Sequence, residues 1–260
     1  MTKNFFDLQN RKVWLFGGAG YLGSRICRAL DDAGARVLCL DVEGRAARMV
    51  EAEGLKLARG EDFDLFAGDG VEAQLADRAR VHGTPDAVVN LAMRGSHAST
   101  LEEATPEQLN ATFAANQTAA IQLGRFFGPR MGDAGGGTVI FFSSMYGMVA
   151  PDPRAYHPPH LPNPVDYGTA KAGVLQIARY FAVYYGRVGV RFNCVTPGAF
   201  PAAEYREASP DTADCLRNKV PLGRFGEPDE IIGPTLFLLS PAASYVNGHS
   251  LVADGGWTIQ

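Results

Sequence analysis

The sequence predicts an α/β fold, a doubly wound parallel sheet of about seven strands with helices on both faces, in a single domain covering residues 1–260. Three observations support this prediction. Short runs of continuous apolar residues alternate with amphipathic segments along the whole chain, as in a parallel sheet that is covered on both faces. A glycine-rich turn follows the first apolar run, and no internal repeat or linker interrupts the alternation.

The composition excludes several classes of protein. A chain of 260 residues can bury one large core, and its formal charge of −4 argues against a nucleic-acid surface. No apolar stretch reaches the roughly 20 residues that span a bilayer, and no signal-like segment opens the chain. We expect a cytoplasmic protein with no membrane segment and no metal site, because its cysteines lack metal-ligand spacing; they are Cys27, Cys39, Cys194 and Cys215.

The first apolar run, 12–16, indicates a buried strand that leads directly into a glycine turn and then a helix reaching about residue 33. Gly17 permits the sharp bend, Gly20 lets the backbone approach a pyrophosphate, and Gly23 allows helix and strand to pack closely. The N-terminus of such a helix offers free N–H groups and a partial positive charge to phosphates. A glycine cluster alone also fits an ordinary turn, so the dinucleotide interpretation depends on the residues beyond this helix.

The second strand, 36–40, ends in Asp41. At this position a carboxylate accepts hydrogen bonds from the ribose hydroxyls of a dinucleotide and repels a 2′-phosphate. The sequence therefore favours NAD over NADP, while the nearby Arg45 and Arg48 weaken that preference.

Periodicity and turn residues predict the remaining elements in order. A polar helix over 44–53 precedes a third strand at 63–68, which ends near Asp69. The region from Pro106 is helical and either breaks before Gln117 or continues to about Met131. The other expected elements are a helix at 71–80, a strand at 86–90, a strand at 137–142, a helix at 166–186, a strand at 190–195, a helix at 229–239 and a strand at 250–253.

Polar or turn-forming residues follow the ends of several predicted strands. Ligands bind outside the carboxyl ends of the strands in such sheets, so we expect these residues to share one site. They are Asp41, Asp69, Asn90, Ser144 and Pro197.

Tyr167 and Lys171 lie one helical turn apart, and Ser144 ends the fifth apolar run. An ammonium four residues along one helix face can lower the pKa of a phenol from about 10. The serine hydroxyl can hold a substrate oxygen. Such a trio moves a proton on or off an alcohol or carbonyl oxygen, and together with a nicotinamide it carries out a redox reaction. Taken singly, Tyr167 also fits a core aromatic and Ser144 a helix cap.

Taken together and in order, these motifs resemble the short-chain dehydrogenase/reductase family over nearly the whole chain, which implies a Rossmann-like sheet. The glycine spacing is similar to that of the extended branch of the family, whereas the length and C-terminus resemble the shorter branch. The matching residues are Gly17–Gly23, Asp41, Asp69, Asn90–Ala92, Asn116, Ser144, Tyr167, Lys171, Asn193–Gly198 and Asp254–Gly256.

The resemblance implies a role for each matching residue. Tyr167 would be the general acid or base, Lys171 would lower the pKa of Tyr167 and hold the nicotinamide ribose, and Ser144 would bind the substrate oxygen. Asn116 would fix a water that links Lys171 to solvent; alone, it also fits an ordinary helix residue. The expected cofactor-binding residues are Gly17, Gly20, Tyr21, Leu22, Gly23, Asp41, Asp69 (at the adenine), Asn90, Ala92, Tyr167, Lys171, Pro197 and Gly198 (at the nicotinamide).

Three segments, about 93–105, 148–166 and 199–222, are the expected substrate loops, the last as a mobile lid. Prolines stiffen the middle segment, which resembles bacterial oxidoreductases of flagellin and surface-sugar modification. It also fits a surface excursion or a subunit contact. Basic and aromatic groups here suit a polar, phosphorylated or carboxylated sugar-like substrate. The expected substrate residues are Arg94, His97, Arg154, Tyr156 and His157.

The resemblance thus implies an NAD(P)-dependent oxidoreductase that interconverts a secondary alcohol and a ketone, with a sugar-derived small molecule as substrate. The helix at 231–239 and the last strand would form the interface of a homodimer or homotetramer. Two alternatives stay open. One is a nucleotide-sugar-modifying enzyme that oxidises its substrate transiently with tightly bound NAD, and the other is a dinucleotide-binding sensor without turnover.

Overall fold

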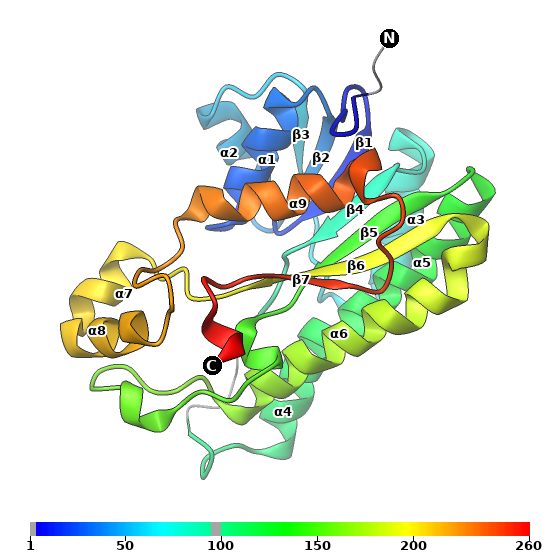
Figure 1. The fold of residues 1–260 in the computed structure, drawn as a ribbon. Helices are drawn as coiled ribbons and strands as arrows, with labels where there is room; N and C mark the ends of the chain where they lie inside the picture. Colours follow the sequence, from blue (N-terminus) through cyan, green and yellow to red (C-terminus); the bar gives the residue numbers. More distant parts are fainter. Residues whose placement is uncertain (1–3, 95–99) are drawn as a thin grey trace.

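The computed structural model describes residues 4–94 and 100–260 (Figure 1). Their strands form one seven-stranded sheet in the order β3-β2-β1-β4-β5-β6-β7, and every neighbouring pair is parallel. The predicted doubly wound α/β sheet is confirmed. The strands are β1 Lys12–Phe16, β2 Arg36–Asp41, β3 Ala58–Asp62, β4 Ala87–Asn90, β5 Gly137–Phe142, β6 Val190–Pro197 and β7 Ser250–Ala253.

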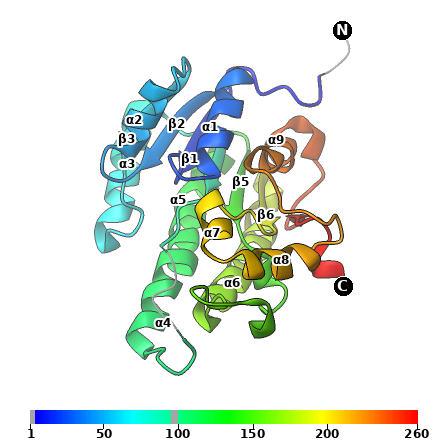
Figure 2. The same ribbon diagram turned by 90° about the vertical axis from the view of Figure 1, so that its left-hand side faces the viewer.

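Helices cover both faces of the sheet (Figure 2). α1, α2 and α9 pack on one face, and α3, α5 and α6 pack on the other. α4 continues beyond the end of the sheet (Figure 1). The helices are α1 Gly23–Asp32, α2 Arg45–Ala52, α3 Val71–His82, α4 Pro106–Phe113, α5 Ala119–Asp133, α6 Val165–Tyr185, α7 Ala203–Ala208, α8 Pro210–Asn218 and α9 Ile232–Leu239.

The position of β1 inside the sheet explains why residues 13–16 are all apolar. Successive side chains of a strand point to opposite faces. Val13 and Leu15 belong to the core beneath α1 and α9, whereas Trp14 and Phe16 belong to the core beneath α3 and α5. Both faces are buried at Val13–Phe16, so these four positions are apolar, whereas Lys12 at the start of the strand is exposed.

The predicted third strand, at 63–68, is wrong: β3 occupies Ala58–Asp62. This strand lies at the sheet edge and pairs only with β2, so it does not need an apolar run. Gly60 is required instead, because a Cβ there would lie 2.4 Å from the backbone of Ala46 in α2. Phe63 and Leu65 enter the core after the strand has ended.

The region from Pro106 is helical to Asp133, so the continuous alternative is the observed one, interrupted only by a π-helical segment at Ala114–Thr118. Thr105 begins it with a capping box formed with Gln108. The predicted helix at 229–239 starts as a 3₁₀ turn before α9.

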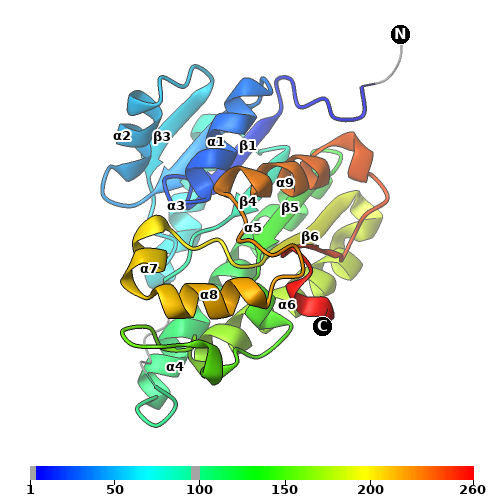
Figure 3. The ribbon, with the colours of Figure 1, turned by 60° about the vertical axis from the view of Figure 1, so that its left-hand side comes forward.

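The expected lid segment contains two short helices, α7 and α8, that the sequence patterns did not predict. They lie beside the proline-rich loop at 150–164 (Figure 3). Within residues 4–94 and 100–260, no helix combines the length and the hydrophobicity that a bilayer crossing requires.

Replacing Gly60 with alanine should destabilise the protein by about 1–3 kcal/mol, because the added Cβ forces α2 away from β3. Gly233→Ala in α9 is the matched control. Nothing lies within 4 Å of the Cβ that it adds, so it should leave stability unchanged or raise it by up to about 1 kcal/mol. Urea unfolding measures both; equal effects of the two substitutions would contradict the packing argument.

Candidate active site

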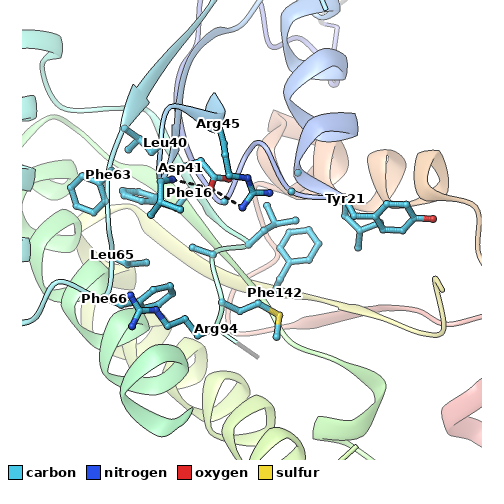
Figure 4. A pocket seen from close by; sticks show the side chains of 18 of the residues that line it. Phe16, Tyr21, Leu40, Asp41, Arg45, Phe63, Leu65, Phe66, Arg94 and Phe142 are labelled. Carbon is cyan, nitrogen blue, oxygen red and sulfur yellow. Dashed lines mark hydrogen bonds and ion pairs between the residues drawn. The ribbon is translucent and has the colours of Figure 1, made fainter. Parts of the chain in front are cut away.

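A cavity of about 950 Å³ lies along the carboxyl ends of the strands (Figure 4). Its size is at the upper end of the range for small-molecule and cofactor sites. It brings together most of the predicted site residues, which come from the ends of β1, β2, β4, β5 and β6 and from α6. The predicted residues in its lining are Gly17, Gly20, Tyr21, Leu22, Gly23, Asp41, Ala92, Arg94, Ser144, Tyr167, Lys171, Pro197 and Gly198.

The glycine turn has the shape that a pyrophosphate requires. Gly17 has φ +73°, and a Cβ there would lie 2.6 Å from the Ala92 nitrogen, so only glycine fits. A Cβ on Gly23 would lie 2.2 Å from the Gly17 oxygen. α1 begins at Gly23 without a side-chain cap, although the Ser24 N–H donates to the Gly20 oxygen at 3.0 Å. The partial positive charge at this N-terminus faces the turn and favours a bound anion. The residues present therefore fit a dinucleotide.

Asp41 lies at the same end of the cavity. Its carboxylate accepts hydrogen bonds from the backbone N–H groups of Ala19 at 3.0 Å and Val42 at 2.9 Å, and it pairs with Arg45 at 3.4 Å (Figure 4). The carboxylate is 8% exposed, whereas the arginine is 47% exposed. The local charge is therefore mixed: the buried carboxylate favours ribose hydroxyls, and the half-exposed guanidinium beside it offsets part of its charge.

At the other end, α6 approaches the end of β5 closely. Ser143 donates a hydrogen bond to the backbone oxygen of Lys171 at 2.9 Å, and the Lys171 ammonium donates one to the Phe142 oxygen at 3.2 Å. Glycines make this approach fit. A Cβ on Gly147 would lie 2.8 Å from the Lys171 carbonyl carbon, and a Cβ on Gly168 would lie 2.8 Å from the oxygen of Tyr146. Strand and helix thus hold Ser144, Tyr167 and Lys171 together.

Burial sets the protonation of this trio. It raises the pKa of the Tyr167 phenol, and a hydrogen bond with Ser144 opposes that rise. It also lowers the pKa of the Lys171 ammonium to about 8. The ammonium lies 5.9 Å from the centre of the Tyr167 ring, and it is Ser144 rather than Lys171 that lowers the pKa of the phenol here. At neutral pH the phenol keeps its proton and can donate it to a carbonyl oxygen.

Asn116 and Asn90 are buried behind the cavity and do not line it. The Asn116 amide, in the π-helical segment, donates to the Thr112 oxygen at 2.9 Å. Asn90 accepts a hydrogen bond from the Ala92 nitrogen at 3.1 Å, which shapes the turn after β4. Both asparagines therefore orient backbone close to the site.

Asp69, expected at the adenine, lies in a 3₁₀ turn outside the cavity lining, so its role there stays a prediction. Its place follows from the position of β3, which ends earlier than predicted. The cavity is lined instead by residues that follow the real end of β3, which the sequence patterns did not indicate: Asp62, Phe63, Asp64, Leu65 and Phe66.

Arg154, Tyr156 and His157 of the proline-rich loop do not belong to the cavity lining, and their role at a substrate stays a prediction. Arg154 is 90% exposed and pairs with Asp152. The backbone N–H of His157 donates to Thr212 of α8 at 2.7 Å. The Tyr156 hydroxyl is hydrogen-bonded to that of Tyr146. The loop thus contacts α7 and α8, a placement that residue types alone did not indicate.

Arg94 lines the cavity but belongs to the end formed after β3. Its guanidinium pairs with Asp64 at 3.3 Å and lies 5.1 Å from the centre of the Phe66 ring (Figure 4). His97 lies outside the described residues. In the described part of the chain, no group of three or more His, Cys, Asp or Glu residues could hold a metal ion.

Comparisons with known proteins agree with this geometry. A family model described as enoyl-(acyl carrier protein) reductase matches residues 18–258. D-threitol dehydrogenase from Mycolicibacterium smegmatis is 29% identical, with 98% of this chain and 95% of that protein covered. A short-chain dehydrogenase from Leptospira borgpetersenii with bound NAD⁺ is 28% identical, with a TM-score of 0.83 over 99% of this chain and 97% of that one.

A gluconate 5-dehydrogenase from Burkholderia cenocepacia, in complex with NADP and tartrate, is 26% identical, with a TM-score of 0.86 and 98% of each chain covered. The chain belongs to the short-chain dehydrogenase/reductase family, as its motifs predict. It is accordingly an enzyme, an alcohol–ketone oxidoreductase whose cofactor is a nicotinamide dinucleotide.

Removing the Lys171 charge should stabilise the protein without its cofactor. Below pH 8 both the folded and the unfolded chain carry the proton, and burial of the ammonium opposes folding. Between pH 8 and the unfolded pKa of about 10.4, only the folded chain has lost the proton, so the free energy of unfolding of the wild type rises with pH. Lys171→Met should therefore gain about 3 kcal/mol at pH 7 and progressively less as the pH rises to 10.

Urea unfolding at pH 7, 8, 9 and 10 measures this difference. Lys56→Met, at an exposed lysine, is the control and should show no such trend. A gain for Lys171→Met that is the same at every pH would show that the buried charge does not cause it.

Proposed function

We propose that this enzyme is an NAD-preferring dehydrogenase that interconverts a secondary alcohol and a ketone on an uncharged polyol or sugar. The observation that carries the proposal is the convergence of Ser144, Tyr167 and Lys171 in one cavity with the glycine turn. When bound, the dinucleotide supplies the carbon that gives or accepts hydride. The protein residues hold the substrate oxygen and move its proton.

In the reducing direction, the Tyr167 hydroxyl donates its proton to the carbonyl oxygen as negative charge develops there. The Ser144 hydroxyl donates a hydrogen bond to the same oxygen. In oxidation the phenolate form of Tyr167 accepts the alcohol proton. Lys171 holds the ribose beside the nicotinamide, and Asn116 fixes the water through which protons return from solvent. The glycine turn and Asp41 bind the pyrophosphate and the adenine ribose, and Pro197 and Gly198 lie beside the nicotinamide.

The charges in the described cavity support a neutral substrate rather than the acidic one suggested by the sequence. Each arginine that lines it is paired, Arg45 with Asp41 and Arg94 with Asp64. Arg154 lies outside the lining and is paired with Asp152. The relative named D-threitol dehydrogenase also supports an uncharged substrate. The transient-oxidation enzyme and the sensor are not favoured, because the relatives are dehydrogenases.

A homodimer or homotetramer remains our proposal for the assembly. β7 is an edge strand of the described sheet, and β7 and α9 leave apolar side chains half-exposed, among them Leu236, Phe237 and Leu251. An edge of this kind is normally covered. α6 offers a second apolar surface, where Tyr180, Val183 and Tyr184 are exposed.

Tyr167→Phe should bind NADH as the wild type does, within about twofold, and lose at least a hundredfold in turnover, because it removes only the proton donor. The measurements are nicotinamide absorbance with tetritols, hexitols and gluconate, and NADH fluorescence for binding. Tyr180→Phe on the exposed face of α6 is the matched control. Undiminished turnover in Tyr167→Phe would contradict the proposed role of Tyr167. If gluconate is the only compound turned over, the proposal of an uncharged substrate is wrong, but the proposed chemistry is not affected.

Asp41→Ser should lower the ratio of kcat/KM for NAD to that for NADP by about tenfold or more. The substitution removes the charge that repels a 2′-phosphate and releases Arg45 to bind it. Glu43→Gln, which changes a second carboxylate at this end of the cavity, should shift the ratio far less. A wild-type enzyme that prefers NADP would refute the assignment of NAD to Asp41.

A further inference from the structure

A fully buried carboxylate lies one residue before Tyr167. Asp166 is 0% exposed and occupies the first turn of α6. Thr112 of α4, also 0% exposed, donates a hydrogen bond to it, with 2.6 Å between the two oxygens. This distance lies within the ordinary range of an O–H···O hydrogen bond. A carboxylate is costly to bury unless such donors satisfy it, so this contact constrains where the first turn of α6 can lie.

Thr112 also contacts the segment that carries Asn116. Its backbone oxygen accepts the hydrogen bond from the Asn116 amide at 2.9 Å. One residue thus holds the Tyr167 turn through its hydroxyl and the Asn116 side chain through its carbonyl. The Asn116 segment is π-helical, and single π-helical turns inside α-helices occur frequently at functional sites.

The Thr112–Asp166 hydrogen bond is one of several contacts that join α6 to the region of α4 and the π-helical segment. The Gln117 side chain donates to the Thr169 oxygen at 3.3 Å, and a Cβ on Gly173 would lie 2.2 Å from the Gln117 amide nitrogen. At the start of α6, Pro164 is the N-cap and supplies no side-chain cap. The Thr112–Asp166 bond therefore adds a side-chain anchor to a turn that its own cap residue does not anchor in this way.

We propose that Thr112 and Asp166 are positioning residues that fix Tyr167 relative to Asn116. Neither lines the cavity, so both act through other residues. The proposal rests on the function proposed above, in which Tyr167 moves the substrate proton and Asn116 its return path. Misplacement by about 1 Å of a group that positions the chemistry can cost about a hundredfold in rate, so losing this link should lower kcat and leave cofactor binding intact.

Thr112→Val removes the hydroxyl and keeps the side-chain shape. It should lower kcat about tenfold or more, with the Kd for NADH within about twofold of the wild type. Thr112→Ser keeps the hydroxyl and should restore kcat to within about threefold of the wild type. Thr138→Val is the matched control, because the Thr138 hydroxyl is buried in β5 and has no hydrogen-bond partner among residues 4–94 and 100–260, and it should leave kcat unchanged. NADH titration counts the folded, binding-competent molecules in each preparation.

The same substitution made in an Asn116→Ala variant separates a positioning role of Thr112 from a general loss of packing. If Thr112 acts through the relation of Tyr167 to Asn116, then Thr112→Val should cost less than about twofold when Asn116 is already alanine. An equal loss in both backgrounds would overturn the proposal, as would a Thr112→Val enzyme as active as Thr138→Val. Failure of the proposed function is seen separately, because Tyr167→Phe would then retain turnover whatever happens at Thr112.

Discussion

The site depends on the close approach of α6 to the carboxyl end of β5. Backbone groups on both sides secure it, since the Lys171 oxygen accepts from Ser143 and the Lys171 ammonium donates to the Phe142 oxygen. Gly147 and Gly168 leave the space that this contact needs. Tyr167 and Lys171 lie on a helix of the packed core, and Ser144 follows β5 as the N-cap of a 3₁₀ turn. The site is therefore built on and next to regular elements, which place functional groups more precisely than loops do.

The burial of Lys171 and Tyr167 in this site lowers the stability of the fold locally. The burial that brings the trio together lowers the pKa of the Lys171 ammonium and raises that of the Tyr167 phenol. Both shifts arise because an apolar environment disfavours charge. The same effect keeps a proton on the phenol, where a carbonyl oxygen can receive it. Functional groups of this kind are retained although a less polar core would fold more stably.

Sequence patterns predicted what depends on periodicity and backbone conformation. The central strands, the glycine turn and the positions of Tyr167 and Lys171 follow from buried runs and fixed spacings. β3 was missed because an edge strand need not be apolar, and the cavity-lining segment at its end, Asp62–Phe66, was missed with it. The residue types of Arg154 and His157 did not predict whether their side chains line the cavity. The Thr112–Asp166 bond joins positions 54 residues apart, beyond any local pattern.

The proline-rich loop and the helices α7 and α8 are tied into one unit. Asp152 accepts a hydrogen bond from Lys219 at 2.9 Å, and the His160 ring stacks on Tyr205 with 3.7 Å between ring centres. A substitution at Lys219 or Tyr205 that removes one of these contacts would therefore loosen the proline-rich loop as well as its own segment.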